Sequence, residues 1–451
     1  MRTAIRRHAG TVCLAVGWLV LQATPIEASQ PNVLLISVDT LRADRMSCYG
    51  YSRNTSPNLD RLLAEGIRFT RARTVEPLTA PALASMLTSL APHEHGSTRN
   101  GLRVRDDLPS LPRILRRQGY RTAAFVGSWT LRNKLWGMDP HFDLFEDVLT
   151  KARWYGLVKR EANAEDINER ALEWLTELRR DESGRPFFAW VHYVEPHAPY
   201  KTQRDFMGQL GPAPEGERYS AESRYDSEIA YVDHFAMKLV DEVRALYSSE
   251  STIVLFVADH GESLGEHGYW GHGRNLYEPT LHIPMGIVWP GKIEPKTIDS
   301  PALIIDLAPT VLGLLSLEVP DFFQGYDWTG VLTSGETPPA GRVTTFQAHK
   351  GSVSPKEQQV ELRQRGLLQV ARIVDERKEI VRVGNSKRWE FDLAVDPAEE
   401  NNLDSPQSEI STALEAWLEA VRAGLQVSDE LPPPSFTDED VEALKALGYL
   451  E

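Results

Sequence analysis

The sequence predicts an α/β fold with a large, mostly parallel sheet flanked by helices, followed by a small C-terminal antiparallel sheet and one helix. Two uninterrupted apolar runs, residues 32–38 and 251–258, are typical of strands buried on both faces of a parallel sheet. Strand and helix patterns alternate through most of the chain, which indicates parallel strands joined by helices. From about residue 340, short strand patterns follow one another, and this favours an antiparallel sheet.

The first 28 residues have the composition of a secretory signal. Three arginines precede an apolar run over residues 11–21, which is too short to cross a bilayer. Cleavage near Ala28 would release a periplasmic or extracellular protein without a stable membrane span. An uncleaved membrane anchor is the alternative interpretation.

The composition is acidic and poor in cysteine. The formal net charge is −15, and it becomes −17 without residues 1–28 because three Arg and one Glu are removed. An acidic surface argues against nucleic acid as the partner. Only Cys48 remains after signal removal, so an exported chain has no internal disulfide, and we expect Cys48 to be a small buried packing residue.

The elements follow in order along two predicted units, 30–335 and 340–451. In the first unit, the patterns predict strands at 67–72, 121–128, 186–194 and 281–291, and helices at 57–66, from Pro81, 111–119, 164–180, 225–246 and 305–315. Two segments lack a clear period: 130–162, expected to be a surface insertion near the site mouth, and 201–222, expected to be a loop over the pocket. In the second unit, strands are expected at 343–349, 367–374, 379–384 and 389–395, with a helix at about 405–423.

Polar side chains stand where the two buried strands end. Asp39 follows the first strand, and Asp259 and His260 follow the strand at 251–258. Open α/β sheets bind ligands beyond the carboxyl ends of their strands, so these groups can converge. Thr79 precedes an Ala/Leu/Met-rich helix, where a hydroxyl faces an anion-attracting helix end. Each aspartate could instead form a turn, and Thr79 could merely cap its helix.

Several motifs together resemble the sulfatase family of the alkaline-phosphatase superfamily, over a stretch from about Asn32 to the last residue. The matching segments are SVDTLRADRMSCYGY, TSPNLDRLLAEGIRFTRA, the Thr79 segment ending in PHEHG, HYVEPHAPY, ADHGESLGEHG, HGRNLYEPTLHIPMGIVWPG, DLAPTVLGLL and FDLAVDPAEENNL. The resemblance implies a sulfatase-like catalytic domain at 30–335 and a C-terminal subdomain after it. No single segment is specific, but their order and spacing are.

The resemblance also implies a set of site residues. A single divalent cation would lie among Asp39, Thr79, Asp259 and His260. Oxygen ligands with one imidazole suit Ca²⁺, Mg²⁺ or Mn²⁺ and do not exclude Zn²⁺. His197 matches the family histidine that contacts the oxyanion or the leaving group, and it is a candidate general acid.

Other residues are expected around the substrate. His272 falls where many relatives carry a Lys that grips the transferred group, and Arg274 could supply that charge instead. His192 is as compatible with a structural role as with substrate binding. His95 follows the Thr79 helix and could reach the pocket, whereas Glu262 and its neighbours are expected behind the ligands.

The nucleophile segment departs from the family pattern. Most sulfatases carry Cys or Ser followed by x-Pro-x-Arg and oxidise that residue to formylglycine, but this chain reads Thr79-Ala80-Pro81-Ala82-Leu83. Oxidation of a Thr carbinol would give a ketone, so we expect no formylglycine and a direct Thr79 nucleophile. Position 40 is Thr where many sulfatases have a second Asp, which lowers the ligand charge.

The sequence therefore favours an exported, metal-dependent hydrolase that cleaves phosphate or phosphonate esters, or sulfate esters, through a covalent Thr79 ester. A phosphoglycerol-type transferase, which passes the group to an alcohol, is one alternative. A catalytically silent, metal-stabilised binding protein is another, because Leu83 and His272 both depart from the common pattern.

Overall fold

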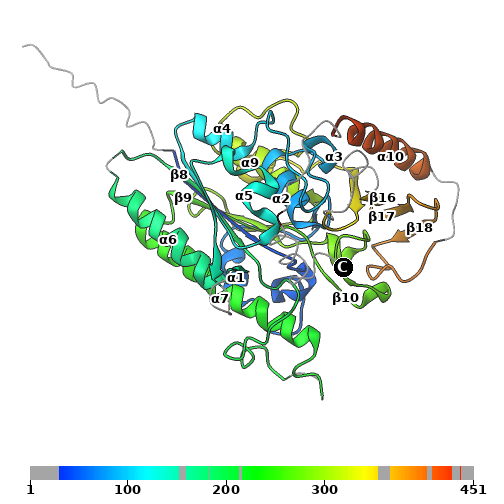
Figure 1. Cartoon of the computed structure of the whole chain (residues 1–451), viewed down its shortest axis with the longest axis horizontal. Helices are drawn as coiled ribbons and strands as arrows, with labels where there is room; N and C mark the ends of the chain where they lie inside the picture. The colour runs from blue at the N-terminus through cyan, green and yellow to red at the C-terminus, as the bar shows by residue number, and fades with distance from the viewer. Residues whose placement is uncertain are drawn as a thin grey trace, which may run out of the picture.

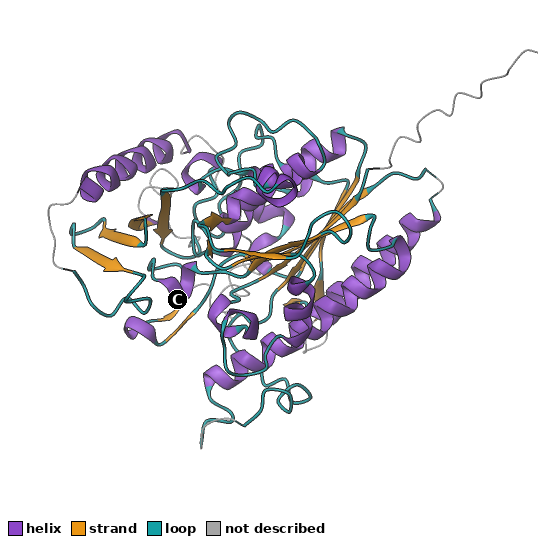
Figure 2. Ribbon diagram, turned by 180° about the vertical axis from the view of Figure 1, so that it is seen from behind, coloured by secondary structure: helices purple, strands orange, loops and turns teal. Residues whose placement is uncertain are grey.

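The chain folds into three layers, with a central sheet between two groups of helices (Figures 1 and 2). This computed structural model describes residues 30–151, 159–181, 183–212, 216–353, 366–403, 409–428 and 437, so the predicted signal at 1–28 lies outside the described residues. Among the described helices, none combines the length and apolar character needed to cross a membrane. The predicted α/β architecture is confirmed.

The central sheet has eight strands and is mostly parallel. In spatial order they are β13 (Lys296–Ile298), β2 (Ile67–Phe69), β12 (Met285–Val288), β9 (Thr252–Ala258), β1 (Asn32–Val38), β8 (Phe187–Tyr193), β4 (Arg121–Val126) and β5 (Leu144–Asp147). β1 lies between β8 and β9 and is parallel to both, whereas β12 runs antiparallel to β9. Every residue of β1, β8 and β9 is buried, which is why these segments read as continuous apolar runs.

Helices cover both faces of this sheet (Figure 1). One face carries α1 (Pro57–Ala64), α6 (Ala164–Arg180) and α7 (Ala221–Tyr247), and the other carries α2 (Thr79–Thr88), α4 (Leu111–Arg117), α5 (Asn133–Trp136) and α9 (Leu307–Leu314). The shorter elements are β3 (Ala72–Arg73), α3 (Pro92–His95), β6 (Leu149–Lys151), β7 (Lys159–Glu161), β10 (Ser263–Leu264), β11 (Trp270–Gly271), α8 (Glu278–Leu281) and β14 (Ala302–Leu303).

A second, four-stranded antiparallel sheet follows, as predicted. Its strands are β15 (Thr344–His349), β16 (Leu367–Val374), β17 (Arg377–Arg382) and β18 (Arg388–Asp392), and α10 (Glu409–Ser428) packs on it. Leu414, Val421 and Leu425 of the helix contact Val370 and Val381 of the sheet. Together these elements form the C-terminal subdomain.

The subdomain is joined to the segment that leads into α2. Gln347 N donates to Val75 O at 3.1 Å, and His349 N donates to Glu76 Oε1 at 2.8 Å. His349 Nδ1 lies 3.0 Å from Glu76 Oε2, and both side chains are completely buried. Strand β15 therefore pairs with the chain three residues before Thr79.

A buried ionic cluster makes a second junction. Lys378 of β17 has no exposed surface, and its Nζ lies 3.0 Å from Glu278 Oε1 and 2.6 Å from Glu399 Oε1. Arg73 Nε approaches the other oxygen of Glu278 at 2.9 Å. Two cations thus balance two carboxylates between the central sheet and the subdomain.

The prediction of a surface insertion at 130–162 is wrong for the described part of that segment. Leu131, Trp136 and Met138 are buried in the main core, and β5 adds an edge strand to the central sheet. The side chains of β5 are only half-buried, so its sequence lacks the apolar run that marks the inner strands. Residues 152–158 lie outside the described residues.

Smaller differences concern element ends. The expected strand at 281–291 is shortened to β12, and the expected strand at 67–72 is divided into β2 and β3. The expected helix from Pro81 begins two residues earlier, at Thr79. Cys48 is half-buried rather than buried.

Candidate active site

The polar residues predicted at strand ends meet at one edge of the central sheet. Val38 of β1 is in register with Ala258 of β9, so the next residues, Asp39 and Asp259, leave the sheet side by side. Thr79 is the first residue of α2 and is completely buried. The ends of two parallel strands and the N-terminus of one helix therefore bring the predicted hydroxyl and carboxylates together.

The distances define a compact cluster of Asp39, Thr79, Asp259 and His260. Thr79 Oγ1 lies 3.5 Å from Asp39 Oδ1 and 3.5 Å from His260 Nε2. His260 Nε2 lies 3.7 Å from Asp39 Oδ1 and 3.5 Å from Asp259 Oδ2. All four side chains are completely buried.

Hydrogen bonds orient the cluster and leave donor atoms directed inward. Asp259 Oδ1 accepts from His260 N at 2.7 Å and from Thr40 N at 3.1 Å. His260 Nδ1 faces Gly261 O at 2.9 Å and so carries the proton, which leaves a lone pair on Nε2. Among the described residues, the Oδ2 atoms of Asp39 and Asp259 have no hydrogen-bond donor.

His192 joins this cluster from β8. Its ring is completely buried, with Nδ1 2.9 Å from Ser37 Oγ and Nε2 3.9 Å from Asp39 Oδ2. One donor atom each from Asp39, His192 and Asp259 lie within 4.8 Å of one another. This position favours metal binding or carboxylate orientation over the substrate contact expected from the sequence.

The electrostatics of the cluster are compatible with a bound cation. Burial, followed by the charge of Asp259, raises the pKa of Asp39 well above its usual range, and burial raises the pKa of Asp259 to about 8. Burial lowers the pKa of His260 and of His192 to about 3, so neither imidazole supplies a positive charge near neutral pH. Two adjacent buried carboxylates and two neutral imidazoles fit a divalent cation.

His197 and His272 form a pair beside this cluster. Their Nε2 atoms are 3.2 Å apart, and the ring centroid of His272 lies 4.4 Å from that of His260. His197 Nδ1 faces Ala198 O at 2.6 Å, and His272 Nδ1 faces Pro77 O at 3.2 Å. Because each Nδ1 donates to a carbonyl, a hydrogen bond between the two Nε2 atoms requires one additional proton. Burial lowers the pKa of both imidazoles, so a proton shared by the pair next to the Thr79 cluster would be readily given up.

The other two predicted substrate residues are placed differently. Arg274 is exposed, whereas His272 is half-buried, so it is His272 that lies against the cluster. His95 is completely buried, with Nε2 2.9 Å from Ser85 Oγ and Nδ1 accepting from Ser97 N at 3.2 Å. Both ring nitrogens of His95 thus hold α2 against the following turn.

Two further acidic residues, Glu262 and Glu161, lie near enough to the cluster for their charges to raise the pKa of Asp39. Glu262, expected behind the ligands, is completely buried, and burial raises its pKa to about 8. Glu161 of β7 is close enough that its charge raises the pKa of Asp39 and opposes the fall in the pKa of His197. Sequence reasoning missed Glu161 because it lies in the segment taken for a surface insertion.

Comparisons with known proteins show which family the chain resembles. The sulfatase family model matches residues 31–317, and the model of the C-terminal region of N-sulphoglucosamine sulphohydrolase matches residues 265–424. An N-acetylglucosamine-6-O-sulfatase of Bacteroides thetaiotaomicron is 25% identical over 84% of this chain and 83% of its own. A choline-sulfatase of Rhizobium meliloti is 27% identical over 64% of this chain and 68% of its own.

Solved structures share the fold. The phosphonate monoester hydrolase of Silicibacter pomeroyi superposes with a TM-score of 0.65 at 21% identity, covering 91% of this chain and 98% of that one. The family match spans most of the central sheet, including Asp39, Thr79 and Asp259. The chain therefore belongs to the sulfatase family.

Proposed function

We propose that the protein is a divalent-metal-dependent ester hydrolase in which Thr79 is the direct nucleophile. One observation carries the proposal: Thr79 Oγ1 lies 3.5 Å from both Asp39 Oδ1 and His260 Nε2, inside a buried group of atoms suited to a cation. The bound cation would lower the pKa of the Thr79 hydroxyl and neutralise the ester oxygens. Asp39, Asp259 and His260 would hold it, with His192 as a further candidate ligand.

The protein's own groups account for the remaining steps. Thr79 Oγ, which would be ionised in the resting site next to the cation, attacks the sulfur or phosphorus atom, the bond to the leaving alcohol breaks, and His197 donates a proton to the departing oxygen. Water then attacks the same centre, the bond to Thr79 Oγ breaks, and the water proton goes to the now neutral histidine pair. Each cycle consumes one water and returns Thr79 and the histidine pair to their starting state.

Sulfate esters of sugars are the first substrate class that we propose. Family membership supports a sulfate ester, and the curated N-acetylglucosamine-6-O-sulfatase supports a sugar as the alcohol. Phosphonate or phosphate esters are the second class. Thr79 and the completely buried, apolar Leu83 stand in the nucleophile helix where the formylglycine pattern has Cys or Ser and Arg, which favours chemistry without that modification.

The test compares two threonines of the same helix. Thr79→Ala should lower kcat by about a thousand-fold or more, as the loss of a covalent nucleophile does, whereas Thr79→Ser should retain substantial activity. Thr88 lies at the far end of α2, where its Oγ1 donates to Ala84 O at 2.7 Å, so Thr88→Ala is the matched control. Near-normal turnover by Thr79→Ala would remove Thr79 as the nucleophile.

The substrate panel separates the remaining alternatives. Aryl sulfate, aryl phosphonate and aryl phosphate diester should be tested with Ca²⁺, Mn²⁺, Mg²⁺ and Zn²⁺, together with the native mass of the Thr79 peptide. A peptide mass about 2 Da below the native value, as oxidation of the Thr79 carbinol to a ketone would give, would contradict the expected absence of modification. Transfer of the sulfuryl or phosphoryl group to added glycerol instead of water would indicate the transferase. Failure to turn over any of these esters would favour the catalytically silent binding protein.

Export is a separate part of the proposal, and it rests on the residues before 29. Expression of the full chain with fractionation and N-terminal sequencing should find the protein outside the cytoplasm, beginning near Ser29. Retention in the cytoplasm with an intact N-terminus would contradict it.

A further inference from the structure

The turn after Asp39 has an unfavourable backbone conformation. Thr40 has a φ of 56°, in the left-handed region that β-branched residues rarely adopt, and it is completely buried. In this conformation, Thr40 N donates to Asp259 Oδ1 at 3.1 Å. The backbone of the turn thus sets the direction of the neighbouring Asp39, and its hydrogen bond sets the direction of the Asp259 carboxylate.

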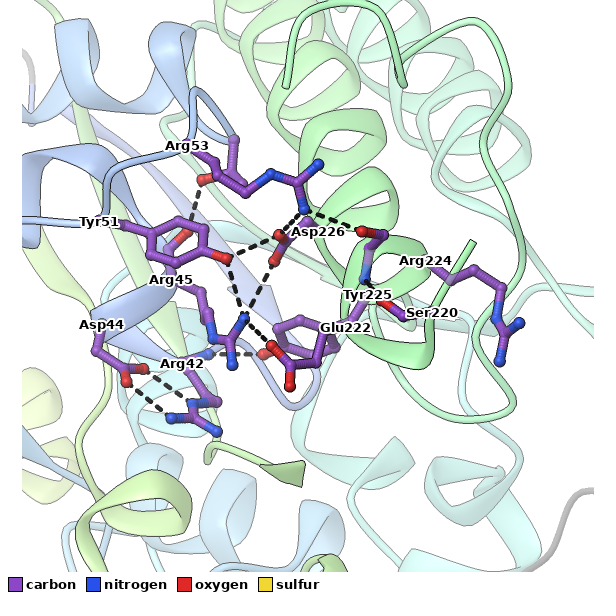
Figure 3. Close-up of polar contacts among 12 residues, drawn as sticks. Arg42, Asp44, Arg45, Tyr51, Arg53, Ser220, Glu222, Arg224, Tyr225 and Asp226 are labelled. Carbon is purple, nitrogen blue, oxygen red and sulfur yellow. Dashed lines mark hydrogen bonds and ion pairs between the residues drawn. The ribbon is translucent and has the colours of Figure 1, made fainter. Parts of the chain in front are cut away.

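One side chain from a distant helix holds this turn. The hydroxyl of Tyr225, in α7, donates to Thr40 O at 2.7 Å and accepts from Arg42 N at 3.0 Å. Tyr225 is completely buried. A single phenol oxygen therefore joins both ends of the strained turn, and Figure 3 shows its contact with Arg42.

Ion pairs fix the surroundings of that contact (Figure 3). Arg42 Nη1 donates to Glu262 O at 3.0 Å and lies 2.6 Å from Glu266 Oε1, so it connects the Asp39 turn to the loop that follows Asp259 and His260. Beside Tyr225 on α7, the buried Asp226 binds Arg53 at 2.5 Å and lies 3.7 Å from Arg45. The helix and both ligand-bearing loops therefore form one connected unit.

We propose that Tyr225 is a positioning residue of the metal site, whose hydroxyl keeps Thr40 left-handed and thereby aims Asp39 and Asp259 at the cation. This inference rests on the proposed metal-dependent function. Without the hydroxyl, Thr40 O and Arg42 N lose the oxygen that both use, and the turn can relax towards an ordinary backbone conformation. The two carboxylates would then lose their common direction while the core around the ring stays filled.

The experiment measures metal affinity rather than activity alone. Tyr225→Phe keeps the ring and removes only the hydroxyl, and its affinity for Mn²⁺ and Ca²⁺ should be titrated on the purified full-length protein. We expect the dissociation constant to rise by about ten-fold or more, as with other groups that orient metal ligands. At saturating metal, kcat should largely recover, because Thr79 and His197 are unchanged.

Tyr120→Phe is the matched control. Tyr120 is also buried, and its hydroxyl donates to a backbone carbonyl, Pro31 O, at 3.0 Å, but at the opposite end of β1. The Tyr120→Phe substitution should lower the melting temperature without changing the metal dissociation constant by more than about two-fold. If the Tyr225 hydroxyl has only a structural role, Tyr225→Phe should likewise lower the melting temperature and leave the metal dissociation constant unchanged.

A second variant tests the backbone argument. Glycine adopts a left-handed φ without steric cost, so Thr40→Gly combined with Tyr225→Phe should regain part of the lost affinity. Unchanged metal affinity in Tyr225→Phe, or no recovery in the double variant, overturns the inference. Absence of metal binding by the wild-type protein overturns the proposed function first, and it is recognised before any variant is compared.

Discussion

The metal-free protein should become less stable as the pH rises from about 4 towards 8, and a divalent cation should reverse this loss. Burial raises the pKa of Asp259 to about 8 and, with the charge of Asp259, the pKa of Asp39 well above its usual range. Between the ordinary aspartate pKa and these raised values, the folded state keeps protons that the unfolded chain has lost. Each such proton lowers the free energy of unfolding by about 1.4 kcal/mol per pH unit.

Metal binding should depend on pH in the opposite sense. The cation binds ionised carboxylates, so each proton released on binding strengthens the affinity by about ten-fold per pH unit within this window. A metal concentration of about 100 times the dissociation constant adds about 2.7 kcal/mol of stability. For a folded region of about 400 residues, this corresponds to a rise of roughly 3 °C in Tm.

The assay is thermal unfolding with chelator or with each cation, at about pH 5 and about pH 8, where the protonation of the pair differs. Calorimetric titration in two buffers of different ionisation enthalpy counts the protons released. Asp259→Asn should lose most of the metal-dependent rise in Tm, because one ligand charge is gone. The same metal-dependent rise at both pH values, or full metal occupancy in Asp259→Asn, would refute the reasoning.

Three further predictions concern the histidine pair and the subdomain junction. His197→Ala should lower kcat for alkyl esters by about a hundred-fold or more but affect nitrophenyl esters far less, because a good leaving group needs little protonation; equal losses would contradict an acid role. Burial lowers the pKa of both His197 and His272, so kcat/KM for alkyl esters should fall as the pH rises through these lowered values, and a flat profile would contradict proton donation by the pair. Lys378→Ala leaves two buried carboxylates with less charge compensation and should cost about 3–5 kcal/mol in denaturant unfolding. Arg422→Ala, which removes an exposed ion pair, should cost less than about 1 kcal/mol, and similar losses for both variants would contradict the buried-cluster argument.

The parts of the site that the sequence predicts are those attached to strong local patterns. Asp39 and Asp259 follow continuous apolar runs, and parallel strands end at the same edge of a sheet, so their proximity follows from the topology. β5 has no such pattern, because its side chains are only half-buried at the sheet edge. The same lack of pattern concealed Glu161, whose position depends on the preceding strands.

Contacts between residues far apart in the chain have no local signal at all. The hydroxyl of Tyr225 reaches Thr40 from near the N-terminal end of α7, on an apolar helical stripe where an aromatic residue is typical of ordinary core. His192 lies in a completely buried strand, and its neighbours are decided by the register between β1 and β8. The left-handed backbone conformation of Thr40 could not be predicted from the sequence either, because threonine rarely adopts it.

The pairing of β15 with the segment before Thr79 changes how the chain can be divided. Glu76 receives two contacts from His349, and Pro77, the next residue, accepts from His272. A fragment ending at residue 335 would keep the candidate ligands but expose an ionisable buried side chain, Glu76, three residues before Thr79. Exchange of C-terminal halves between related proteins should therefore disturb the segment before Thr79, and a chimaera would need residues 75–79 and 344–349 from the same parent.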